Sequence, residues 1–148
     1  MIAPFARCTA TLLLAGTVAL AGCASTPDQP CVNIPGLSGT WQYQGTATSP
    51  EPITLGGTLV LQAGECGTFD GTIDLLEQDQ NGATDRVAGP VHGQMLDAKS
   101  VQFDAFLDAT ASQHFGTLAG DSVTGTWVEG SDPGAASGSF TMRRAPAP

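Results

Sequence analysis

Apolar residues recur at every second position along much of this chain, and no segment shows the period of about 3.6 residues that marks an amphipathic helix. In the segment TFDGTIDLL, Phe69, Ile73 and Leu75 share one face of an extended chain, whereas Asp70 and Asp74 lie on the other. This pattern is typical of a strand with one buried and one hydrated face. The sequence therefore predicts an all-β protein.

Turn-forming residues divide the alternating segments into roughly eight strands. Their predicted ranges are 38–47, 53–62, 67–77, 86–96, 100–108, 112–119, 122–129 and 137–144. The short connections imply antiparallel neighbours, because parallel strands need crossovers of about a dozen residues or more. Such strands can close into an up-and-down barrel, which removes both sheet edges from solution. We predict an eight-stranded antiparallel barrel, with a β-sandwich as the alternative.

A Gly-Thr-hydrophobic triplet recurs in these strands, for example at 39–41, 57–59 and 125–127. Its glycine and its large residue share one face, and its threonine lies on the other. Glycine next to a bulky residue on the inner face allows a small barrel to coil tightly. Threonine favours strands and tolerates water. The triplet therefore predicts curvature rather than catalysis.

The first 22 residues have the layout of a secretory signal peptide, with a positive charge at Arg7, an apolar run and small residues at the end. The apolar run covers about eleven residues, whereas a helix needs roughly twenty to span a bilayer. The residues that follow, Leu20-Ala21-Gly22-Cys23, resemble the lipobox of bacterial lipoprotein precursors. An ordinary signal peptide followed by a chance cysteine is the alternative.

The lipobox resemblance implies that Cys23 becomes the first residue and carries a diacylglyceryl group and an amide-linked acyl chain such as palmitate. Two or three acyl chains, at ~0.8 kcal/mol per buried methylene, form a lasting membrane anchor. Residues 23–30 are then a lipidated tether, 31–144 a single domain and 145–148 a disordered tail. Ala24 is not the Asp of an inner-membrane retention signal, so we expect the outer membrane, with a periplasmic or surface-facing domain.

The net charge restricts which molecules the protein can bind, and the cysteine content indicates a disulfide. The net charge is −9, and only Arg86, Lys99, Arg143 and Arg144 remain as formal positive charges after the signal peptide. This composition excludes nucleic acid, whose phosphates must be neutralised by Lys and Arg. In an exported, oxidising compartment Cys31 and Cys66 are expected to form a disulfide. A catalytic thiol or half of a metal site is the alternative role for these cysteines.

The first strand, with Gly39-Thr40-Trp41, resembles the Gly-x-Trp start shared by lipocalins and, more loosely, avidin-like proteins. In lipocalins an arginine near the end of the last strand packs over that tryptophan and closes the barrel. The resemblance implies that Arg143 or Arg144 does this to Trp41. The lipocalin middle motif and the helix after the barrel have no counterpart here.

No catalytic motif stands out, and neither a metal site nor a cofactor is expected. Alternation places His92 outside and His114 inside, and most carboxylates fall at outward positions or in turns. Residues 77–85 mimic the first half of a Ca²⁺ loop, but the twelfth position is Ala88 instead of a bidentate glutamate. A solvated hairpin around Asn81-Gly82 explains the same residues. We expect a protein that is not an enzyme.

Two functional classes follow from a lipid-anchored envelope barrel. In the first, the barrel mouth binds a small apolar or amphipathic ligand. The inward residues expected to line it are Tyr43, Phe69, Phe103, His114 and Trp127. In the second, the interior is filled and the domain is an envelope structural or interaction module. A bacterial family of lipocalin-like protease inhibitors also begins with Gly-x-Trp, so the second class includes an inhibitor that contacts an envelope protein.

Overall fold

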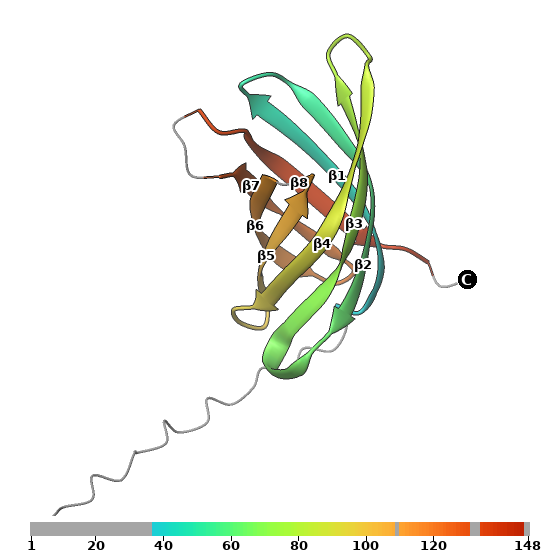
Figure 1. Cartoon of the computed structure of the whole chain (residues 1–148). Helices are drawn as coiled ribbons and strands as arrows, with labels where there is room; N and C mark the ends of the chain where they lie inside the picture. The colour runs from blue at the N-terminus through green and yellow to red at the C-terminus, as the bar shows by residue number, and fades with distance from the viewer. Residues whose placement is uncertain (1–36, 109, 131–133, 147–148) are drawn as a thin grey trace, which may run out of the picture.

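The chain folds into one closed, antiparallel, eight-stranded barrel in a computed structural model that describes residues 37–108, 110–130 and 134–146 (Figure 1). Its strands are β1 Gly39–Ser49, β2 Ile53–Ala63, β3 Thr68–Asp79, β4 Thr84–Met95, β5 Ser100–Leu107, β6 Thr110–Ala119, β7 Ser122–Glu129 and β8 Ser137–Arg144. Each strand pairs with the next, and β8 pairs with β1. The up-and-down barrel is confirmed, and the β-sandwich alternative is wrong. The signal peptide, Cys23, the tether and Cys31 lie outside the described residues.

The predicted and observed strands agree to within about two residues, and β3 and β4 both extend further into their shared hairpin than predicted. The Asp79 carboxylate accepts hydrogen bonds from the backbone N–H groups of Asn81 and Ala83, both at 2.8 Å. Gly82 adopts a φ of +81°, which suits glycine. This tight turn lets β3 and β4 pair further than predicted, and the hairpin projects beyond the neighbouring turns (Figure 1).

Helical structure is confined to the short 3-10 helix η1, Glu65–Gly67, in the described part of the chain. Among those residues, no helix is long and apolar enough to cross a membrane.

The antiparallel order gives the barrel two different ends. The connections after β1, β3, β5 and β7 lie together at one end, which we call the mouth. The opposite end, which we call the plugged end, carries the connections after β2, β4 and β6, the start of β1 and the end of β8.

Glycines of the triplets stand where two strands approach closely. A Cβ atom on Gly57 would lie 2.0 Å from the carbonyl oxygen of Asp74 on the next strand, and one on Gly125 would lie 2.0 Å from that of Phe115. No side chain fits at such distances. These glycines therefore permit the strong coiling that closes a barrel of this size.

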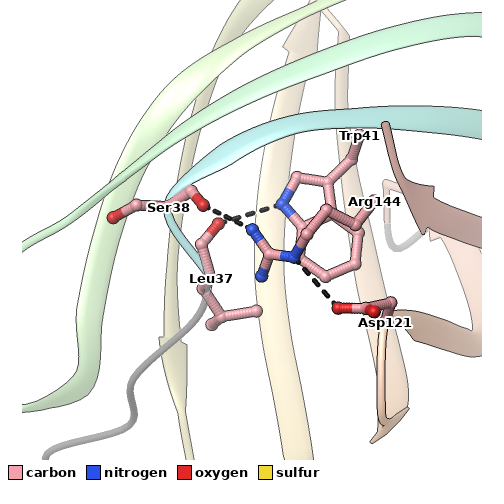
Figure 2. A network of polar contacts seen from close by, with 5 residues as sticks. All are labelled: Leu37, Ser38, Trp41, Asp121 and Arg144. Atoms are coloured by element: carbon pink, nitrogen blue, oxygen red, sulfur yellow. Dashed lines mark hydrogen bonds and ion pairs between the residues drawn. The ribbon is translucent and has the colours of Figure 1, made fainter. Parts of the chain in front are cut away.

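The plugged end is closed by Trp41 and Arg144, which Figure 2 shows together. Trp41 is fully buried and donates its indole N–H to the carbonyl oxygen of Leu37 at 2.9 Å. The Arg144 guanidinium donates to the carbonyl oxygen of Ser38 at 2.6 Å and to the Asp121 carboxylate at 3.2 Å (Figure 2). The last strand is thereby tied to the entry of the first strand and to the β6–β7 turn.

Candidate functional site

A cluster of rings fills the middle of the barrel. The rings of Phe103 and His114 stack with centroids 4.3 Å apart, and those of Tyr43 and Phe140 stack at 5.7 Å. Trp127, the cross-strand partner of His114 on β7, continues the stack with its ring centroid 6.4 Å from that of His114. All five side chains are buried. They form a floor that separates the mouth from the plugged half of the core.

Two polar side chains in this floor, Tyr43 and His114, form a hydrogen bond with each other. The Tyr43 hydroxyl lies 3.1 Å from Nε2 of His114, and Nδ1 of that ring lies 3.3 Å from the carbonyl oxygen of Ser112. Because a carbonyl only accepts, Nδ1 carries the proton and Nε2 accepts from Tyr43. Burial lowers the pKa of His114 to about 4, so the ring is neutral at pH 7. Burial also raises the pKa of Tyr43.

Above the floor lies a cavity of about 50 Å³ that opens toward the mouth. Its lining residues come from β1, β2, β3, β5, β6, β7 and the segment before β8: Tyr43, Ile53, Leu55, Leu75, Glu77, Leu107, Ser112, His114, Trp127, Glu129 and Ala136. Sites for drug-sized molecules usually measure roughly 300–1,000 Å³. The cavity therefore has room for one small group rather than for a whole ligand.

A second, more open hollow of about 270 Å³ lies beside it at the β3–β4 hairpin. It shares Ile53 and Glu77 with the inner cavity and adds Asp79 and Asp85. The mouth is thus a shallow acidic hollow beside a small aromatic pit. Together they can hold a molecule of modest size, with one group inserted into the pit.

Trp127 lines the pit and carries an unsatisfied polar atom. The residue is 6% exposed, and its indole Nε1 is buried without a hydrogen-bond partner among the described residues. Leaving such a donor unpaired costs about 1–3 kcal/mol. A guest whose acceptor oxygen reached this N–H would recover the energy, so the pit is compatible with a polar group as well as with a hydrocarbon.

The five residues expected to line a ligand site are all buried, as alternation requires. Tyr43, His114 and Trp127 line the cavity. Phe69 and Phe103 do not: Phe103 stacks on His114 within the floor, and Phe69, near the plugged-end start of β3, packs against Phe103.

Two carboxylates at the mouth are exceptions to the outward pattern that most of them were expected to follow. Glu77 and Glu129 line the cavity. Alternation carried this signal, because Glu77 shares a face with Leu75 and Glu129 shares one with Trp127. Burial raises the pKa of Glu77, and the charges of Glu129, Asp85 and Asp108 raise it further. The residues that form the described mouth hold no group of three or more His, Cys, Asp or Glu side chains placed to bind a metal ion.

The sequence matches no protein-family model, and no curated protein is significantly similar to it. Solved structures do share the fold. The protein EF1p2_mFAP2b bound to DFHBI is 17% identical, with a TM-score of 0.60 over 74% of this chain and 94% of that chain. A fluorescence-activating β-barrel of de novo design is 20% identical, with a TM-score of 0.51 over 73% of this chain and 93% of that chain.

A natural protein also shares the barrel. The S-type phycobiliprotein lyase CPES from Guillardia theta is 9% identical, with a TM-score of 0.50 over 76% of this chain and 90% of that chain. At such identities these similarities establish the barrel fold alone.

Proposed function

We propose that this protein is a bacterial envelope lipoprotein, anchored in the outer membrane through acyl chains on Cys23, whose barrel mouth binds a small amphipathic ligand without chemical conversion. One observation carries the binding proposal. The pit at the mouth combines apolar walls with Trp127, whose buried indole N–H has no hydrogen-bond partner among the described residues. Buried polar groups are ordinarily paired, so a donor left unpaired in a residue that lines a cavity favours a ligand there.

The structural neighbours support this use of the fold. EF1p2_mFAP2b is bound to DFHBI, as is the redesigned barrel mFAP1, which has a TM-score of 0.57 and 17% identity to this chain. Barrels of this shape therefore accommodate small molecules. The absence of catalytic motifs from the sequence favours binding over conversion.

The anchor rests on the sequence Leu20-Ala21-Gly22-Cys23. Metabolic labelling with palmitate and membrane fractionation test it. The wild-type chain should be labelled and sediment with membranes, and Cys23→Ser should be unlabelled and uncleaved. Label retained by Cys23→Ser would contradict the anchor.

Native mass spectrometry of the lipidated chain, purified in mild detergent, tests the ligand. A stoichiometric small-molecule adduct is expected. A chain that never carries one, from any growth condition, would contradict the binding proposal.

The size of the pit favours a second candidate. A cavity of about 50 Å³ above a floor of stacked rings is close to a filled interior. The domain would then act as an envelope interaction module, including an inhibitor of the lipocalin-like kind. Co-purification of one envelope protein at fixed stoichiometry, with a bare mass for the barrel, would favour this candidate.

A further inference from the structure

We propose that the ligand of the mouth is a small organic cation: an ammonium or guanidinium group attached to an apolar body, with a hydrogen-bond acceptor nearby. This inference rests on the proposed binding function and adds the charge class of the ligand. It follows from which groups the mouth contains and from how few of their charges are compensated.

Carboxylates reach the mouth from three strands. Glu77 on β3 and Glu129 on β7 line the inner pit, and Asp85 on β4 lines the outer hollow together with Glu77. Asp85 and Glu77 are also cross-strand partners in the sheet. Like charges placed so close repel one another unless a cation lies between them.

The protein supplies no such cation in its described part. Arg86, the basic residue next to Asp85 in the β3–β4 hairpin, forms an ion pair with the Asp74 carboxylate on the outer face of the barrel. Arg144 is bound at the plugged end. No hydrogen bond or ion pair joins the carboxylate of Glu77 or Glu129 to another described residue. These two acids are half-buried, so water compensates their charges less than it does at the surface.

The pit below the acids suits the rest of such a ligand. Trp127 and Tyr43 provide aromatic rings, which attract cations through their faces, and Leu55 and Leu75 provide apolar walls. The unpaired indole N–H of Trp127 requires an acceptor, which a bare alkyl ammonium lacks. An amine whose body carries a hydroxyl, ether or carbonyl oxygen satisfies both the acids and the indole.

A metal ion fits the mouth less well. Asp79 uses its carboxylate to hold the hairpin turn, and Asp85 accepts the backbone N–H of Arg86 at 2.8 Å. The carboxylates of the described mouth do not converge on a common point. A bulky organic cation can interact with separated acids, whereas a Ca²⁺ ion needs about six to eight oxygens at roughly 2.3–2.6 Å.

Three probes of similar size separate charge from hydrophobicity: 2-phenoxyethylammonium, 2-phenoxyethanol and phenoxyacetate, each of which carries an ether oxygen as the acceptor. Each is titrated into the full lipidated chain in a non-ionic detergent and followed by the two indole N–H signals in ¹⁵N NMR. Trp127 reports the pit, and Trp41, bonded to the carbonyl oxygen of Leu37 at the plugged end, is the internal control. The ammonium probe should shift the Trp127 signal with an affinity at least about tenfold above those of the alcohol and the carboxylate.

A double variant and a single control, both of which replace glutamate by glutamine, test the acids. The double variant Glu77→Gln with Glu129→Gln should lose about tenfold in affinity for the ammonium probe and keep its affinity for the alcohol. The control Glu65→Gln, in η1 at the plugged end, should change neither. Unfolding temperatures measured on the same samples show that the variants are folded.

Equal binding of the three probes at Trp127 would overturn the cation inference and leave the proposed ligand-binding function intact. A shift of the Trp127 signal by CaCl₂ alone, with none by the ammonium probe, would overturn it in favour of a metal. If no probe shifts the signal but native mass spectrometry shows an adduct, only the inference fails. If no adduct is seen either, the proposed function fails with it.

Discussion

The guanidinium carbon of Arg144 lies 4.4 Å from the centroid of the Trp41 ring, so that the last strand of the barrel covers the first (Figure 2). Trp41 is fully buried, and Arg144 also donates to the carbonyl oxygen of Ser38. Both interactions depend on a planar, permanently charged guanidinium. The pair therefore closes the plugged end both by packing and by hydrogen bonding.

Replacing Arg144 by lysine should lower the free energy of unfolding by about 1–2 kcal/mol, because an ammonium cannot stack and donate in the same geometry. Urea denaturation followed by tryptophan fluorescence measures the change. The neighbouring Arg143, which is exposed, is the matched control. Arg143→Lys should stay within about 0.5 kcal/mol of wild type. Equal losses in both variants would contradict the closing role of Arg144.

Adjacent glycines on β2 offer a second matched pair. An alanine at position 57 would place its Cβ 2.0 Å from the carbonyl oxygen of Asp74, whereas one at position 56 would meet nothing within 4 Å. Gly57→Ala should cost at least about 2 kcal/mol. Gly56→Ala should change stability by no more than about 0.5 kcal/mol. Thermal unfolding compares the two, and similar midpoints would argue against glycine-dependent coiling.

The buried histidine predicts a pH dependence of stability. The pKa of His114 falls from 6.5 to about 4 because the ring is buried, so the unfolded chain binds a proton that the folded chain does not. The contribution of His114 to the free energy of unfolding is therefore fully present above about pH 6.5. It falls by on the order of 3 kcal/mol as the pH drops from 6.5 toward 4. Equilibrium unfolding between pH 7 and 4 measures it.

Most of the slope between about pH 6.5 and 5 should be lost in His114→Gln, because the shifted carboxylates contribute mainly at lower pH. The slope should persist in His92→Gln, which changes the exposed histidine on the outer wall. An undiminished slope in the His114 variant would assign the pH dependence to other groups.

The Cys31–Cys66 disulfide stays a prediction, since Cys31 lies outside the described residues. Intact-mass spectrometry before and after reduction should show a gain of about two daltons, one hydrogen for each sulfur. Closing this loop should stabilise the fold by on the order of 3–4 kcal/mol. An unchanged mass on reduction would contradict the disulfide and would favour a catalytic or metal-binding role for these cysteines.

Alternation and turn chemistry were sufficient to predict the barrel, because a strand with one apolar face and short turns has few ways to bury that face. The same rule selects Arg144 over Arg143, since Phe140, Met142 and Arg144 occupy alternate positions of β8. It also places Glu77 inside, although a glutamate is ordinarily interpreted as a surface residue. Strand alternation therefore identifies inward residues of the mouth, such as Glu77, that would be assigned to the surface by residue type alone.

The size of the pit could not be predicted from the pattern. It depends on how rings from strands distant in sequence meet across the barrel. Phe140 stacks on Tyr43, and His114 lies between Phe103 and Trp127. Alternation identifies each ring as inward but contains no information on which rings touch or on what space they leave. The unpaired indole N–H of Trp127 likewise emerges only from three-dimensional packing.

The central claim is that a small molecule occupies the pit, and filling the pit with a side chain tests it most directly. Ala136 lines the cavity from the segment before β8, and Ala119, an exposed residue at the end of β6, is the control. Native mass spectrometry of the lipidated chains should show a one-to-one adduct in wild type and Ala119→Leu and its loss in Ala136→Leu. An adduct that persists in folded Ala136→Leu would contradict the claim.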